Sequence, residues 1–253
     1  MKKSLLAMLV ILTFATSAFA GVSYLTAPSV GEGNWAVLGM YATDHNGNLA
    51  NRDGNPNALD SNSLGVRGEY GVMKDVDLLL SYTFDTLPNV KDLDAKQTTG
   101  NTLGLGGKYA LGKQTLPLIG TVVDTAAVLG YQSSNVGLKL DAGGSTSVAS
   151  TVLGIGYVIS KQMDNLIPYG AISYKMLTQD LGKTPGLKVD AMSGKALAFN
   201  IGCMIGIAKD QAIAVEYNTE NQAWSEISKS GTKLDDASAV SVSGISLGYV
   251  YVF

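Results

Sequence analysis

The sequence is poor in the residues that most often carry chemistry. Its 253 residues include one histidine, His45, and one cysteine, Cys203. A single cysteine excludes an intramolecular disulfide. Charged residues make up 15% of the chain and the net charge is −3. Nucleic-acid-binding proteins need basic patches, so this balance predicts no nucleic-acid partner.

Long hydrophobic runs are absent beyond the N-terminus. Residues 1–20 combine two early lysines, the apolar stretch Leu5–Phe14 and a small-residue site at Ala18 and Ala20. This three-part pattern predicts a signal peptide cleaved after Ala20, because the apolar run is too short to cross a bilayer as a helix. Cleavage leaves 16 basic and 21 acidic residues, a net charge of −5.

The remaining chain is rich in glycine, with 30 in all, and repeatedly alternates large apolar with polar or small residues. In one segment, Val76, Leu78, Leu80, Tyr82 and Phe84 alternate with Asp77, Ser81, Thr83 and Asp85. A period of two places the two sets on opposite faces of a strand. A wall with apolar residues on its outer face and polar or small residues on its inner face is typical of a membrane-spanning barrel. The sequence therefore predicts an all-β fold, a transmembrane antiparallel up-and-down β-barrel.

The alternation predicts ten strands, an even number, as single-chain bacterial barrels have. The fifth is irregular around Asp124, so eight or twelve strands stay open. We expect the strands at Asn34 to Asp44, Ser63 to Met73, Val76 to Thr86, Asn101 to Gly112, Ile119 to Ser133, Ser147 to Ser160, Ile167 to Leu177, Lys195 to Ala208, Ala212 to Asn218 and Val240 to Phe253.

The connections alternate between short and long, which is independent support for a barrel. Outer-membrane barrels have short periplasmic turns and long external loops. With ten strands, both termini then lie in the periplasm and the long loops lie outside the cell. The predicted organisation is a signal peptide at 1–20, an N-terminal periplasmic segment at 21–33 that crosses the lumen mouth or the rim, and a barrel at 34–253.

The last strand carries a further signal. Tyr249, Tyr251 and Phe253 end the chain on alternating aromatics, which resembles the C-terminal recognition signal of outer-membrane barrel proteins. Over essentially the whole mature chain, the pattern resembles the superfamily of small outer-membrane barrels that includes the OmpA-type and opacity-type proteins. The resemblance implies a place in the cell outer membrane, contact with its lipids and lipopolysaccharide, and insertion by the barrel-assembly machinery.

The same alternation turns a set of charges toward the lumen. Three bases and three acids can neutralise one another, and buried charges are costly unless paired. We therefore predict a cross-strand network that narrows or closes the lumen; the alternative is a hydrated pore lining. The members are Arg67, Glu69, Asp77, Lys108, Lys175 and Glu216.

Function is less determined, because the superfamily includes adhesins, pores, structural proteins and a few enzymes. We expect a non-enzymatic barrel without cofactors, with a structural or surface-interaction role through its loops. The alternatives are a small-solute or lipid-passing channel and a rim hydrolase using His45 with Asp44 or Asp85. Trp224, in the expected last loop, either anchors an unknown external ligand or packs that loop. Oxygen-bearing residues of the first loop leave calcium binding open.

Overall fold

The computed structural model describes residues 26–46, 59–87, 95–117, 120–140, 145–180, 191–229, 232–234 and 240–253. The strands are β1 (Trp35–Asn46), β2 (Leu59–Met73), β3 (Val76–Leu87), β4 (Ala95–Thr115), β5 (Val122–Leu140), β6 (Ser145–Ser160), β7 (Leu166–Asp180), β8 (Ala191–Ala208), β9 (Gln211–Lys229), β10 (Thr232–Leu234) and β11 (Val240–Val252). Among these residues there is no helix long and apolar enough to span a bilayer.

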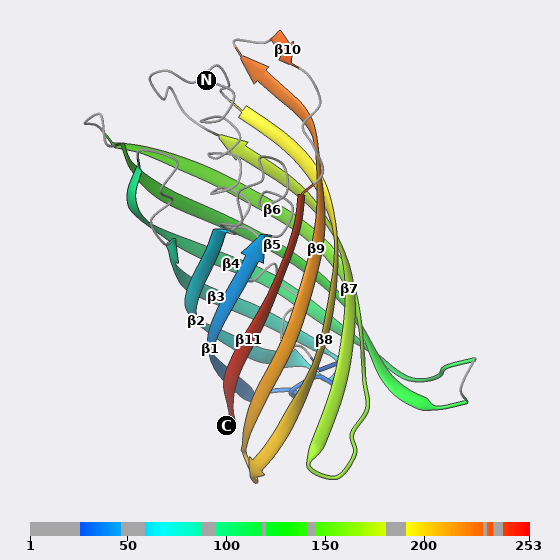
Figure 1. Ribbon diagram of the computed structural model, residues 1–253. Coiled ribbons are helices and arrows are strands. Elements are labelled where there is room, and N and C mark those ends of the chain that lie inside the picture. The colour runs from blue at the N-terminus through cyan, green and yellow to red at the C-terminus, as the bar shows by residue number, and fades with distance from the viewer. Residues whose placement is uncertain are drawn as a thin grey trace.

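Ten of these strands form a closed ring (Figure 1). Each strand from β1 to β9 pairs antiparallel with the next, β9 pairs with β11, and β11 returns to β1 over the register Ala36↔Val252 to Asn46↔Val242. The short β10 pairs only with β9 and lies outside the ring. The predicted up-and-down barrel of ten strands is confirmed, and the counts of eight and twelve are wrong.

Several strands run further than predicted. β4 begins at Ala95 rather than Asn101, and β9 continues to Lys229 rather than ending at Asn218. Trp224 therefore belongs to a strand, in register with Gly194, and its placement in a loop was wrong. The apolar alternation stops where the wall leaves the lipid, whereas the backbone pairing that defines a strand continues beyond it.

The outer wall is a band of large apolar residues. Leu64, Leu80, Ile155 and Ile201 each expose between 55% and 65% of their surface, which only a lipid environment makes favourable. Two groups of aromatics border the band. The first lies near the short connections: Trp35, Tyr70, Tyr109, Tyr157, Tyr251 and Phe253. The second, the upper girdle, lies at the other edge: Tyr41, Tyr82, Tyr131, Tyr174, Phe199 and Tyr217.

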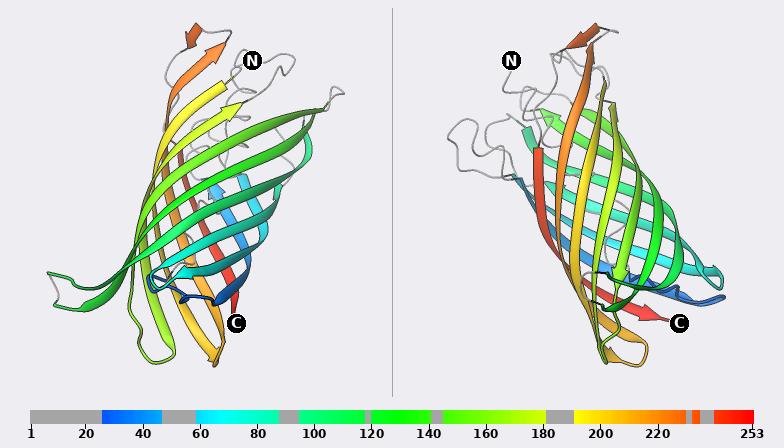
Figure 2. Two further views of the ribbon diagram at one scale, coloured as in Figure 1. Left: turned by 180° about the vertical axis from the view of Figure 1, so that it is seen from behind. Right: turned by 90° about the vertical axis from the view of Figure 1, so that its right-hand side faces the viewer.

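The two ends of the barrel differ in their connections. The short turns at residues 74–75, 161–165 and 209–210 gather at one end, together with the C-terminus (Figures 1 and 2). We call this the turn end. At the opposite loop end the connections lie outside the described residues. The β4–β5 hairpin also turns at the turn end, but it projects sideways from the wall (Figure 2).

The interior combines polar side chains with two apolar clusters. One cluster includes Leu38, Met40, Tyr169 and Met204, and the other joins Ala27, which precedes β1, to apolar residues of β3, β5, β6 and β7. Tyr169 lies over Gly202, where a Cβ atom would come within 2.5 Å of the ring. Side chains thus occupy much of the lumen, and they are less uniformly polar than the alternation suggested.

Candidate functional site in the lumen

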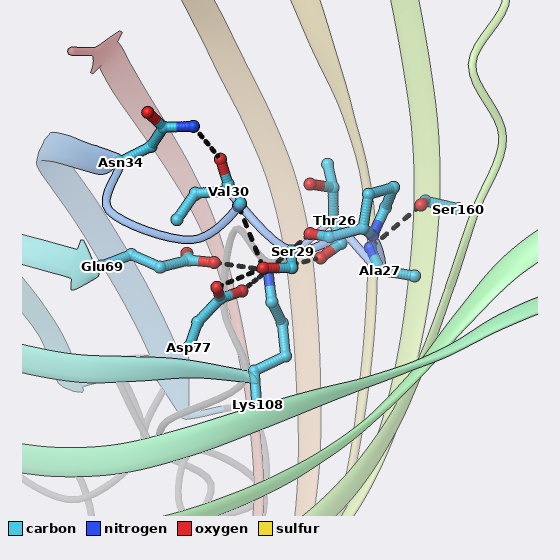
Figure 3. A network of polar contacts seen from close by, with 11 residues as sticks. Thr26, Ala27, Ser29, Val30, Asn34, Glu69, Asp77, Lys108 and Ser160 are labelled. Atoms are coloured by element: carbon cyan, nitrogen blue, oxygen red, sulfur yellow. Dashed lines mark hydrogen bonds and ion pairs between the residues drawn. The ribbon is translucent and has the colours of Figure 1, made fainter. Parts of the chain in front are cut away.

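The residues before β1 enter the lumen at the turn end. This luminal segment, Thr26–Asn34, hydrogen-bonds to strands on both sides of the ring (Figure 3). The amide of Ala27 donates to Ser160 Oγ at 3.0 Å, and the amide of Gly33 donates to the carbonyl of Gly71 at 2.8 Å. Ala27 is fully buried. The segment is therefore packed into the barrel as part of its interior.

Lys108 holds the luminal segment to the wall (Figure 3). Its Nζ donates to the carbonyls of Pro28 at 2.7 Å and Thr26 at 3.2 Å, and it pairs with Glu69 and with Asp77, whose Oδ2 is 3.0 Å away. The side chains of Lys108 and Asp77 are 1% and 0% exposed. A lysine has three protons to donate and no acceptor, and here carboxylate and backbone oxygens surround them.

Asp77 binds the segment directly as well. Ser29 Oγ donates to Asp77 Oδ1 at 2.5 Å, and the same hydroxyl accepts from the amide of Gly31 at 3.0 Å. Hydrogen bonds to a charged acceptor are stronger than neutral ones. The predicted members Glu69, Asp77 and Lys108 thus lie together, and Ser29 is a fourth side chain that the strand pattern does not reveal.

Gly71 makes the close approach of the segment possible. A Cβ atom there would lie 1.9 Å from the carbonyl oxygen of Gly31, which itself has a positive φ of 89°. We expect Gly71→Ala to displace the segment and to lower the free energy of unfolding by about 1–3 kcal/mol, as overpacking does. Gly68→Ala, on the same strand with open space around it, is the control. Equal stability of the two variants in urea unfolding would contradict the close packing.

A second ion pair lies on β7 and β9. Lys175 pairs with Glu220, and both side chains are 4% exposed. Gln222 Nε2 donates to the other oxygen of Glu220 at 2.8 Å. Glu216, expected in the same network, instead accepts from Asn200 Nδ2 at 2.8 Å. The sequence missed Glu220 because it assigned that residue to a loop.

The acidic residues considered for a hydrolase face the lumen. Asp44 is 1% exposed and Asp85 is 4% exposed. Asp85 accepts hydrogen bonds from Ser63 Oγ at 2.6 Å and from Thr102 Oγ1 at 3.3 Å. His45 belongs to β1, in register with Asp60 and Ser243, and its side chain lies outside the described part. The first loop, with its proposed calcium ligands, lies outside it too.

The side chain of Arg67 lines two separate spaces. One is a cavity of about 600 Å³ at the turn end, which it lines with Leu38, Glu69, Met204 and Val250. The other is a small space of about 10 Å³ against the wall, which it lines with Met40, Leu79 and Gln132. Arg67 itself is 7% exposed. The lumen therefore has a vestibule at the turn end, with the buried Arg67 in its lining.

The C-terminal aromatics lie at the turn end of the seam. Phe253 is 69% exposed, and its amide donates to the carbonyl of Trp35 at 2.8 Å. Its ring contacts that of Tyr251, with centroids 4.6 Å apart. Tyr249 donates to Gln211 Oε1 at 2.7 Å. The signal-peptide residues Ala18 and Ala20 lie outside the described residues.

No protein-family model matches the chain, and no curated protein matches it. Among solved structures it is similar to the outer membrane protease OmpT from Escherichia coli, with 13% identity, 87% and 96% of the two chains covered and a TM-score of 0.42. It is also similar to the translocator domain of the autotransporter NalP from Neisseria meningitidis, with 11% identity, 99% and 96% covered and a TM-score of 0.48. A third is the outer membrane protein OprG from Pseudomonas aeruginosa, with 14% identity, 89% and 99% covered and a TM-score of 0.37. The chain's own strand pairing makes it a closed antiparallel β-barrel of ten strands.

Proposed function

We propose that this chain is a closed barrel of the outer membrane with a structural or surface-interaction role, rather than an open pore or an enzyme. The observation that supports this most is the luminal segment, which hydrogen-bonds to β2 and to β6 and is held to the wall by Lys108. The buried Arg67 and the buried pair of Lys175 with Glu220 occupy further parts of the interior. Hydrated ions need a continuous wet path, and in this proposal these side chains interrupt it.

The loop end supports a surface role. Beyond the upper girdle the strands continue with exposed small or polar residues on their outer face: Thr43, Asn101, Asn135, Ser147, Thr178, Lys195 and Asn221. Spanning a bilayer takes only about 9–11 residues per strand, and β9, which starts at the turn end, has 19. The excess makes a polar wall. In our proposal this wall, with Trp224 of β9, and the loops beyond it face the outside and meet an unknown external ligand and lipopolysaccharide.

The turn end then faces the periplasm, with both termini of the mature chain. The assembly machinery in this proposal reads the last strand through Tyr249, Tyr251 and Phe253. The exposed ring of Phe253 beside the seam is accessible for such recognition.

Single-channel recording in planar lipid bilayers tests the closed lumen. We expect the refolded mature protein to insert without steady conductance. A variant that lacks residues 21–33 removes the luminal segment and should add only brief openings, because Lys175 and Glu220 remain. Steady open conductance of the unaltered protein would overturn the proposal.

A second candidate function is a gated small-solute channel, which the vestibule of about 600 Å³ favours. Its volume lies in the range of small-molecule pockets. In that case conductance or solute uptake appears under a stimulus, such as membrane voltage. Recording the same protein over a range of voltages distinguishes this candidate from a permanently closed barrel.

A further inference from the structure

The outer wall has a groove that crosses four strands. Two rows of register partners border it: Ile159, Gly170, Ile201 and Tyr217 in one, and Tyr157, Ile172, Phe199 and Thr219 in the other. The groove has a volume of about 570 Å³ and an almost wholly apolar lining. Gly170, in register with Ile159 and Ile201, places no side chain between them. One row includes Tyr157, of the aromatic group near the turn end, and the other includes Tyr217 of the upper girdle, so the groove lies within the lipid-facing band.

The β4–β5 hairpin overhangs the end of the groove nearest the turns. Leu116 of this hairpin lines the groove opposite Tyr157 and Ile159. The hairpin closes tightly, with the amide of Leu116 donating to the carbonyl of Thr121 at 2.9 Å, and it projects from the wall (Figures 1 and 2). Lys113, Gln114 and Thr115 of its β4 arm are polar and exposed, and the side chain of Lys113 is 75% exposed. Such a hairpin fits the headgroup layer, where its polar groups stay hydrated.

We propose that this groove holds a phospholipid of the leaflet at the turn end. Because the groove is continuous with the lipid-facing band, hydrocarbon chains are what it meets in the membrane. An acyl chain that enters the groove contacts the wall on both sides and also contacts Leu116. More of the acyl chain's surface is therefore buried than on a flat wall. The headgroup lies at the hairpin and the β6–β7 turn, where the exposed Lys113 and Lys161 attract its phosphate. This binding does not depend on whether the lumen conducts.

Gly170 allows a direct test. A Cβ atom there would make ordinary contacts, the nearest at 3.7 Å to a backbone oxygen, so Gly170→Leu fits and fills the groove. Gly39→Leu is the matched control, because Gly39 is an exposed glycine on the outer face of β1 with nothing within 4 Å of a Cβ. Each protein is placed in nanodiscs of equal parts phosphatidylethanolamine and phosphatidylglycerol. It is then released into mild detergent, and native mass spectrometry counts the retained phospholipid.

We expect one phospholipid to stay with the unaltered protein and with Gly39→Leu, and its retained fraction to fall by about tenfold in Gly170→Leu. If Gly170→Leu does not refold, Ile172→Trp, which narrows the same groove, replaces it as the test variant. Retention by the groove variants equal to that of the unaltered protein would overturn the proposal, as would an equal loss in Gly39→Leu. A parallel experiment with lipid A in the nanodiscs tests which leaflet supplies the bound lipid. Retention of lipid A but not of phospholipid would contradict the assigned leaflet.

Discussion

Replacing Lys108 by Met lowers the free energy of unfolding by about 3–5 kcal/mol, the cost of leaving buried charges without their partner. The variant keeps the length of the side chain but removes the ammonium group that pairs with Glu69 and with the fully buried Asp77. The carbonyls of Thr26 and Pro28 lose their donor as well. Equilibrium urea unfolding in phospholipid vesicles, followed by tryptophan fluorescence, measures the loss.

Two further variants show where that loss comes from. Lys209→Met removes an exposed turn lysine and should change stability by less than about 0.5 kcal/mol. Adding Glu69→Gln and Asp77→Asn to Lys108→Met removes the uncompensated charges and should restore most of the stability. A loss below about 1 kcal/mol for Lys108→Met itself would mean that water reaches the cluster and that the turn end is wet.

The second large effect concerns Lys175 and Glu220. Lys175→Met and Glu220→Gln should each cost about 3–5 kcal/mol, since each removes one member of a buried ion pair. The double variant should cost less than their sum by about 0.5–3 kcal/mol, the range found for directly interacting pairs. The control is a double-mutant cycle on Lys113 and Asp124. The Lys113 Nζ atom lies 3.9 Å from Asp124 Oδ1, and the lysine side chain is 75% exposed. The coupling energy of this pair should stay below about 1 kcal/mol. Equal coupling in both cycles would contradict a dry interior around Lys175.

The sequence correctly predicted the features that follow from the two-residue repeat of a β-strand. It placed Asp77 and Lys108 on the inner face of neighbouring strands, and the structure pairs them directly in register. Alternation sets the face of each residue but not its height, which depends on strand tilt and register. For this reason the predicted set of six charges divides into separate groups in the structure, with Lys175 beside Glu220.

Other parts of the site have no periodic signal. Thr26 and Pro28 bind Lys108 through backbone carbonyls, which any residue supplies, and the need for Gly71 arises only from contact with Gly31. Glu220 was missed because large outward residues end near Tyr217, although the strand continues to Lys229. The apolar pattern records the thickness of the lipid, so it cannot mark where a strand ends in water.

The seam between β1 and β11 has a consequence for assembly. It joins Ala36 to Val252, so the ring closes only through contacts between the two ends of the chain. Long-range closure of this kind is slow. Until it happens, β1 and β11 each present a row of unpaired amides and carbonyls, which invites pairing with another chain. Chains that end before Val240 lack β11 and leave β1 and β9 as permanent edges. We therefore expect such chains to aggregate through these two edges rather than persist as open sheets.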